Sequence, residues 1–139
     1  MELRSVFLDA NILIYLIEGI SPAAQMAKSF VADCEQRGDA LMTSSLAVGE
    51  VFVKPLRAGD VDLLRKYESF FQPPQIKVID FNQECALVFA KLRGIGVKPP
   101  DAIHLSCASI SNVDVFATND QRLSKLIVPG ILHITSFNQ

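Results

Sequence analysis

The 139-residue sequence has no tryptophan, only two histidines and three cysteines, and no large excess of charge of either sign. Cys34, Cys85 and Cys107 are far apart and show no Cys-x-x-Cys spacing, which argues against a disulfide framework and against a zinc site. We expect them to be small core residues. The formal net charge of -2 argues against a generally basic nucleic-acid binder, although it leaves room for a local binding site.

Long uncharged apolar runs are also missing. Asp9, Asn11 and Glu18 interrupt the most apolar stretch, which stays below the roughly 18 residues needed to cross a bilayer. The start, MELRSV, lacks the pattern of a secretory signal. We therefore expect a cytoplasmic protein. Hydrophobic residues make up 50% of the chain, enough for one sizeable core, so residues 1–139 are expected to form a single domain.

What the sequence does contain is a regular alternation of strand-like and helix-like segments. Short apolar or β-branched segments predict strands at residues 6–9, 40–44, 75–80, 113–120 and 130–137. Helical periodicity with caps and stops predicts helices from residue 11 onward and over 21–38, 44–54, 60–74, 82–96, 99–112 and 121–127, with Pro55 as a kink or end of the third. Strands separated by helices pair in parallel, so the sequence predicts a three-layer α/β/α sandwich.

Four acidic residues stand at positions that call for explanation. Asp9 and Asp120 each follow a predicted strand, and Asp101 follows two prolines at a helix start. Each of these three could simply cap a helix or a turn. Glu50 lies within a helix among apolar neighbours, where its ordinary role would be a surface pair with Lys54, four residues later. Taken singly, none of the four acids requires a functional site.

The predicted topology brings the four acids together. In an open parallel sheet, ligands bind beyond the carboxyl ends of the strands, where the strand order reverses. If the strands before Asp9 and Asp120 are neighbours, the two carboxylates face each other, and the helices of Glu50 and Asp101 start from the same edge. Four carboxylates would repel one another unless a divalent cation lay between them. Oxygen ligands suit Mg²⁺ or Mn²⁺, either of which can activate water for attack on a phosphoryl group.

Four segments together resemble the PIN-domain family, and within it the small proteins of the VapC type: FLDANILIY, TSSLAVGEV, KPPDAIHLSCA and VFATNDQRL. The resemblance spans nearly the whole chain. It implies a parallel sheet of about five strands in the order 3-2-1-4-5, with strands 1 and 4 adjacent. It also implies a metal-dependent endoribonuclease that leaves 5′-phosphate and 3′-hydroxyl ends.

The resemblance assigns a role to each acid at its position in this sequence. Asp9 and Asp101 match the principal metal-binding acids, and Glu50 and Asp120 complete the catalytic cluster. Asp9, Asp101 and Asp120 would hold the metal directly or through water. Glu50 could be a further ligand or could orient the attacking water.

The resemblance also gives supporting roles to two uncharged polar residues. Thr118 matches a hydroxyl residue that helps to position Asp120 or a water, and Asn11 matches a residue that often supports Asp9. His104 lies three residues after Asp101 on the same helical face, so it could support the site. A core or interface histidine is the favoured interpretation, and His133 is taken as structural.

An RNA substrate would also need cations near the acids. Lys98 and Arg122 are the nearest in sequence to the acids, although solvated surface charge is the favoured interpretation of such residues. The wider set of candidates is Arg4, Lys54, Arg57, Lys98, Arg122 and Lys125.

PIN proteins of this size commonly form homodimers, and those that are toxins are blocked by an antitoxin. The resemblance therefore predicts a homodimer and a toxin with an antitoxin partner. Apolar helix positions within residues 45–72 could supply a partner surface or belong to the core; they are Phe52, Leu63, Leu64, Tyr67, Phe70 and Phe71.

Other functions remain to be weighed against the nuclease. A non-catalytic PIN-like module that binds RNA or protein is the main alternative. A phosphorylatable receiver domain is disfavoured because Ala10, and not a second acid, follows Asp9, and because the last strand has no lysine. A dehalogenase-like phosphatase would need an aspartate where Asn11 stands.

Overall fold

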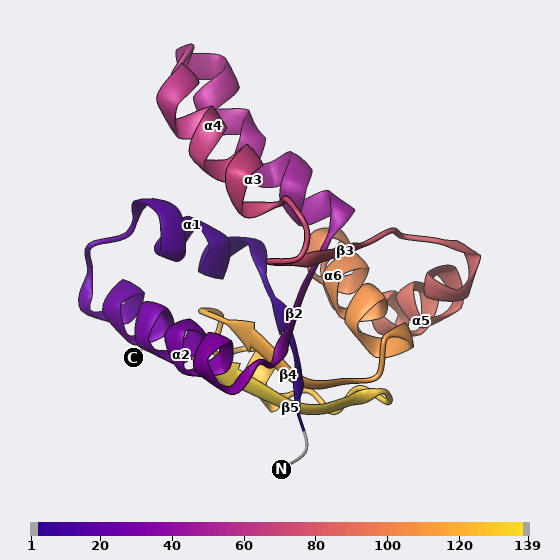
Figure 1. The fold of residues 1–139 in the computed structure, drawn as a ribbon. Helices are drawn as coiled ribbons and strands as arrows, with labels where there is room; N and C mark the ends of the chain where they lie inside the picture. The colour runs from indigo at the N-terminus through magenta and orange to yellow at the C-terminus, as the bar shows by residue number, and fades with distance from the viewer. Residues whose placement is uncertain (1–2, 138–139) are drawn as a thin grey trace.

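The computed structural model describes residues 3–137 and contains one parallel five-stranded sheet of order β3-β2-β1-β4-β5 (Figure 1). The order and the parallel pairing predicted from the resemblance are confirmed. The strands are short and lie side by side in the centre of the molecule; they are β1 (Ser5–Leu8), β2 (Ala40–Ser44), β3 (Lys77–Ile79), β4 (Val113–Thr118) and β5 (Ile131–Ser136).

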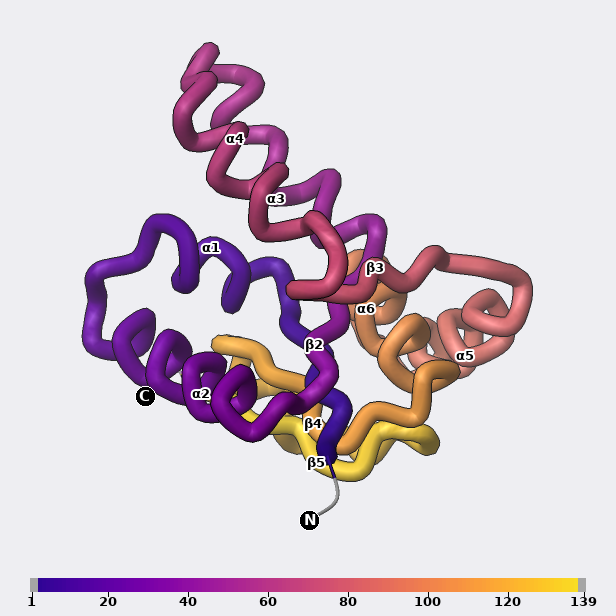
Figure 2. The backbone as a smooth tube through the Cα atoms, viewed as in Figure 1, coloured from indigo at the N-terminus to yellow at the C-terminus, as the bar shows by residue number. Residues whose placement is uncertain are grey.

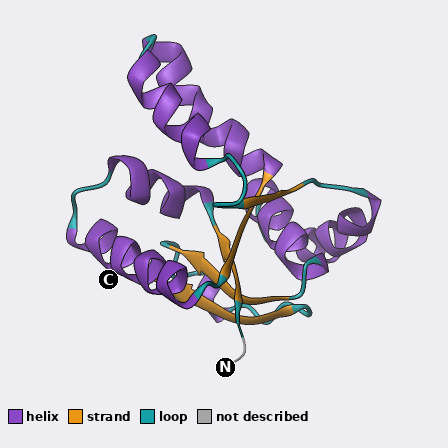
Figure 3. Ribbon diagram, in the orientation of Figure 1, coloured by secondary structure: helices purple, strands orange, loops and turns teal. Residues whose placement is uncertain are grey.

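Helices cover both faces of the sheet, which gives the expected three layers (Figure 3). One face carries α1 (Ala10–Glu18) and α2 (Pro22–Arg37), and the other carries α5 (Gln83–Gly94) and α6 (Pro99–Ile110). The helices α3 (Ser45–Ala58) and α4 (Val61–Phe70) form a hairpin that extends away from the sheet (Figure 2). A short 3-10 helix, η1 (Leu123–Lys125), precedes β5.

The alternation of side chains along the central strand divides the core in two. Val6 and Leu8 of β1 pack in the cluster that includes α1 and α2, whereas Phe7 points to the α5 and α6 side. There Phe7 stacks on Phe116 of β4 with ring centroids 5.2 Å apart. The side chains of Val6, Phe7 and Leu8 are fully buried, and each contributes about 1.5–3 kcal/mol through burial. The strand that ends directly before Asp9 is therefore held firmly from both faces.

The prediction that the third helix ends near Lys54 is wrong. Helix α3 continues through Pro55 to Ala58, because the proline ring is buried in the protein and the helix tolerates the loss of one backbone hydrogen bond. The helix ends at Gly59, whose φ of 63° is a left-handed conformation that favours glycine. The segment 121–127 forms only the single turn η1.

Most of the apolar positions within residues 45–72 belong to the core. Tyr67 is fully buried, and the partly buried Phe52, Leu63, Phe70 and Phe71 pack against the same cluster. The three cysteines are buried and unpaired, as expected for small core residues. Within residues 3–137, no helix is both long enough and apolar enough to cross a membrane.

Candidate functional site

The carboxyl ends of β1 and β4 lie side by side at the centre of the sheet. Leu8 pairs with Ala117 in the register, and the Asp9 backbone N–H continues the ladder by donating to the Ala117 carbonyl at 3.0 Å. The next residues of both strands therefore leave the sheet at one point, with β2 on one side and β5 on the other. This is the position at which an open parallel sheet binds its ligands.

Asp9 is buried at this point, with only 4% of its surface exposed. Its Oδ1 accepts a hydrogen bond from the Ala10 N–H at 2.8 Å, so the residue does cap α1. Its Oδ2 accepts from the Thr118 hydroxyl at 2.8 Å and from Asn11 Nδ2 at 3.3 Å. Capping of α1 uses only Oδ1, and the bonds from Thr118 and Asn11 fix the orientation of Oδ2.

Thr118 and Asn11 tie the two strand ends together. The Thr118 hydroxyl also accepts from the Asp120 N–H at 3.1 Å, which links Asp9 and Asp120 through one oxygen atom. Asn11 Oδ1 accepts from the Asn119 N–H at 3.0 Å. Because Thr118 is fully buried, these bonds are shielded from water, and the positions of Asp9 and Asp120 depend on one another.

His104 is buried, as the favoured interpretation of the sequence expected, and it also contacts two of the acids, as the alternative interpretation expected. It is 2% exposed, and its Nε2 lies 2.7 Å from Glu50 Oε1 and 3.8 Å from Asp9 Oδ1. Since an ionised carboxylate only accepts, the Nε2–H donates to Glu50. The only sequence signal for this role is the three-residue spacing from Asp101 on a mostly apolar helix.

A serine that the sequence analysis did not single out orients the histidine. Ser44 Oγ lies 2.7 Å from His104 Nδ1 and also accepts from the Ala47 N–H at 3.0 Å, so it caps α3. The start of α3 is thereby fixed relative to α6. The ordinary partner expected for Glu50 is engaged elsewhere, because Lys54 forms an ion pair with Glu18 at 2.6 Å.

Burial and like charge dominate the electrostatics of the centre. Burial raises the pKa of Asp9, although His104 and the Thr118 hydroxyl oppose it. Burial also raises the pKa of Asp101, and the charges of Asp9 and Asp120 add to that effect. Burial alone would lower the pKa of His104, but the Glu50 hydrogen bond and the Asp9 charge outweigh it, so the pKa is raised. Negative charge in this centre is therefore only partly compensated by the protein.

Asp120 is compensated by a neighbouring arginine. Arg122 donates from Nε to Oδ1 at 3.1 Å and from its terminal nitrogen to Oδ2 at 2.9 Å, and these bonds lower the pKa of Asp120. Asp120 Oδ1 also accepts from the Arg122 N–H, so the turn-capping interpretation holds as well. Lys98 occupies the N-cap position of α6 without a side-chain capping bond, and Asp101 follows in the first turn.

The acids influence one another electrostatically, because Glu50 acts on Asp9 and both Asp9 and Asp120 act on Asp101, yet they do not form a preformed metal cage. Among residues 3–137, no three His, Cys, Asp or Glu side chains lie close enough together to hold one ion. Glu50 is held by His104 and Asp120 by Arg122. Asp9 and Asp101 fit a divalent cation best, because they supply the oxygen atoms that Mg²⁺ and Mn²⁺ prefer. Burial is the main reason that their pKa values are raised, and a cation would favour their ionised forms.

Solved structures with this fold include several VapBC toxin-antitoxin complexes. VapBC from Salmonella typhimurium bound to DNA is 20% identical, with a TM-score of 0.70 over 98% of this chain and 99% of that one. VapBC2 from Rickettsia felis, bound to a fragment of promoter DNA, is 17% identical, with a TM-score of 0.70 over 95% and 98%. VapC20 from Mycobacterium tuberculosis, a toxin that cleaves the sarcin-ricin loop, is 13% identical, with a TM-score of 0.65 over 80% and 86%.

At these identities the solved structures establish the shared fold. No match is found among the curated proteins. The family comparison is more direct, because the PIN domain matches residues 6–128 and so includes all four acids, His104 and both supporting polar residues. The chain belongs to the PIN-domain family.

Proposed function

We propose that the protein is a metal-dependent endoribonuclease and the toxin component of a toxin-antitoxin pair. The observation that carries the proposal is the centre at the ends of β1 and β4, where the buried Asp9 lies near the partly buried Asp101 of α6. Burial raises the pKa of both groups, and the charges of Asp9 and Asp120 raise that of Asp101 further. A protein keeps such an arrangement at a cost in stability, which is typical of a functional site. Membership of a family generally composed of nucleases supports the same conclusion.

Asp9, Asp101 and Asp120 are the residues that would hold Mg²⁺ or Mn²⁺. When bound, such an ion lowers the pKa of a water and offsets charge on the phosphoryl group. Asp9 is already oriented for this task by Thr118 and Asn11. Asp120 becomes available when Arg122 leaves it, and an RNA phosphate is a suitable new partner for the guanidinium.

Glu50 is the acid best placed to orient or deprotonate the attacking water. Its side chain is 39% exposed, so water reaches it, while the His104 Nε2–H holds one of its oxygens. His104 is in turn held by Ser44. The products of in-line attack by water on the phosphodiester are a 5′-phosphate and a 3′-hydroxyl end.

The partners follow from the same proposal. Related solved structures are toxin-antitoxin complexes, which supports an antitoxin partner for this chain. RNA is the proposed substrate, with Lys98 and Arg122 as candidate phosphate contacts. A homodimer in the cytoplasm remains our prediction, and sedimentation of the purified protein tests the homodimer.

Incubation of the purified protein with structured and single-stranded RNAs, in Mg²⁺, Mn²⁺ or EDTA, tests the proposal. We expect cleavage with either metal, none in EDTA, and 5′-phosphate ends on the products. Asp9→Asn and Asp101→Asn should abolish cleavage, whereas Asp62→Asn, at an exposed position in the first turn of α4, should not. Cleavage in EDTA would overturn the metal site. RNA or protein binding without cleavage of any RNA would favour the non-catalytic module.

A further inference from the structure

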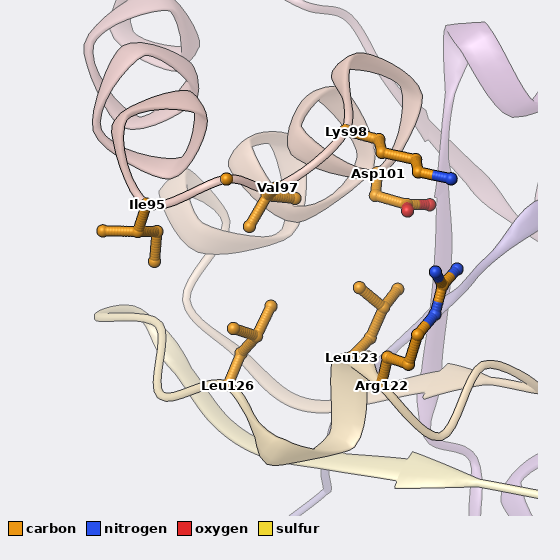
Figure 4. Close-up of a pocket in the computed structure, with 8 residues that line it drawn as sticks. Ile95, Val97, Lys98, Asp101, Arg122, Leu123 and Leu126 are labelled. Carbon is orange, nitrogen blue, oxygen red and sulfur yellow. The ribbon is translucent and has the colours of Figure 1, made fainter.

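A pocket of about 210 Å³ opens beside Asp101, and its aliphatic part has no role in the proposed chemistry (Figure 4). It lies between the loop that joins α5 to α6, the first turn of α6 and the segment around η1. Four aliphatic side chains form most of its wall and face one another across the cavity: Ile95, Val97, Leu123 and Leu126.

Charged groups gather at one end of this pocket. Figure 4 shows the ends of the Lys98, Asp101 and Arg122 side chains pointing to the same side, away from the aliphatic wall. Within the described part of the chain Lys98 has no ion-pair partner, and Arg122 pairs with Asp120. Lys98 and Arg122 therefore lie at the end of the pocket that contains Asp101, one of the proposed metal-binding acids.

The pocket has an aliphatic half and a cationic half, so it fits a ligand that has both an apolar and an anionic group. The aliphatic half favours a flat or compact apolar group, and the cations favour a phosphate next to it. A free phosphate would leave the apolar wall in water. A basic peptide would be repelled by Lys98 and Arg122. A nucleotide of single-stranded RNA satisfies both halves, because unstacked bases bind apolar side chains while their phosphates bind cations.

We propose that this pocket binds the base of the nucleotide that adjoins the scissile phosphate. The inference rests on the proposed nuclease function, since Asp101 links the pocket to the metal-binding centre. The aliphatic wall carries no hydrogen-bonding side chain that could read a base edge. Contact with this wall therefore selects a base by size and shape, and occupation of the pocket sets which phosphodiester lies at the acids.

The wall offers a variant that does not disturb the core. Ile95 is 69% exposed, so Ile95→Ser removes part of the apolar wall without opening a cavity in the protein. Ile127 is a matched control, because it is 96% exposed and lies next to Leu126 in the chain but does not line the pocket. Lys98→Met removes one cation and leaves the wall intact.

Titration of methyl NMR signals with mononucleotides tests the proposal without requiring catalysis. The probes are uridine 5′-monophosphate, adenosine 5′-monophosphate and ribose 5-phosphate, which has no base. We expect saturable shifts at Ile95, Val97 and Leu126 with at least one nucleotide and about tenfold weaker binding of ribose 5-phosphate. Ile95→Ser should weaken nucleotide binding alone, Lys98→Met should weaken both classes of probe, and Ile127→Ser should change neither.

The possible failures are distinguishable. Equal binding of ribose 5-phosphate and nucleotides, or nucleotide binding that leaves these methyl groups unmoved, overturns the base pocket even if the protein cleaves RNA. Nucleotide binding at these methyl groups in a protein that cleaves no RNA supports the pocket and refutes the nuclease. An antitoxin that shifts them when no nucleotide does would assign the pocket to a protein partner and also overturn the proposal.

Discussion

Replacing Thr118 by valine should destabilise the protein far more than the loss of one hydroxyl group suggests. The hydroxyl donates to Asp9 Oδ2 and accepts from Asp120 N–H and Asn11 Nδ2, and valine keeps the shape while removing all three bonds. At about 1 kcal/mol for each bond, with a further penalty for buried groups left unpaired, we expect a loss of about 2–4 kcal/mol in the free energy of unfolding. For a domain of this size the melting temperature should fall by about 6–12 °C.

Thr43→Val is the matched control for this experiment. Thr43 is also fully buried in the sheet, but its hydroxyl makes a single bond, to the Leu8 carbonyl at 2.7 Å. Its replacement should cost about 1 kcal/mol. Urea unfolding followed by circular dichroism in EDTA measures both variants without any contribution from metal. Equal losses for the two variants would show that Thr118 does not join Asp9 and Asp120 into one unit.

Two further predictions concern the stability of the fold outside the candidate site. Burial alone would raise the pKa of Asp39, but the Arg4 N–H and the Arg37 guanidinium outweigh it and hold that pKa below its usual value. The ionised Asp39 therefore stabilises the folded protein fully above about pH 4, and this stabilisation is lost as the pH falls further. The free energy of unfolding in urea should accordingly depend less on acid for Asp39→Asn than for the wild type. Gly59 and Gly130 both have positive φ, so replacing either by alanine should lower the free energy of unfolding by roughly 1 kcal/mol through backbone strain. Of these two, only Gly130 would place the new Cβ 2.2 Å from a backbone oxygen. Thermal unfolding should therefore show a loss several times larger for Gly130→Ala than for Gly59→Ala. Comparable losses for the two glycines would contradict the clash.

The topology was predictable because its signals are local and agree with one another. Strand and helix periodicities alternate along the chain, and together with the family resemblance they give the order that places Asp9 beside Asp120. The path of α3 through Pro55 was not predictable in this way, because it depends on how the proline ring packs in the folded protein. A local rule about proline cannot contain that information.

The site was predictable in its acids and less so in their partners. Asp9 and Thr118 are near their strand ends in the sequence, so parallel pairing alone brings them together. The chain of contacts from Ser44 through His104 to Glu50 joins residues on β2, α6 and α3. Its geometry depends on how these elements pack, which no short motif encodes. The ion pair of Lys54 with Glu18, and not with Glu50, likewise depends on how the helices pack.

Titration of Mn²⁺ into the metal-free protein, followed by calorimetry, tests directly whether Asp9 and Asp101 bind a divalent cation. We expect saturable binding to the wild type, its loss in Asp9→Asn and Asp101→Asn, and unchanged binding in the Asp62→Asn control. Absence of binding to the wild type, or equal binding to the wild type and Asp101→Asn, would contradict a metal centre built on these carboxylates.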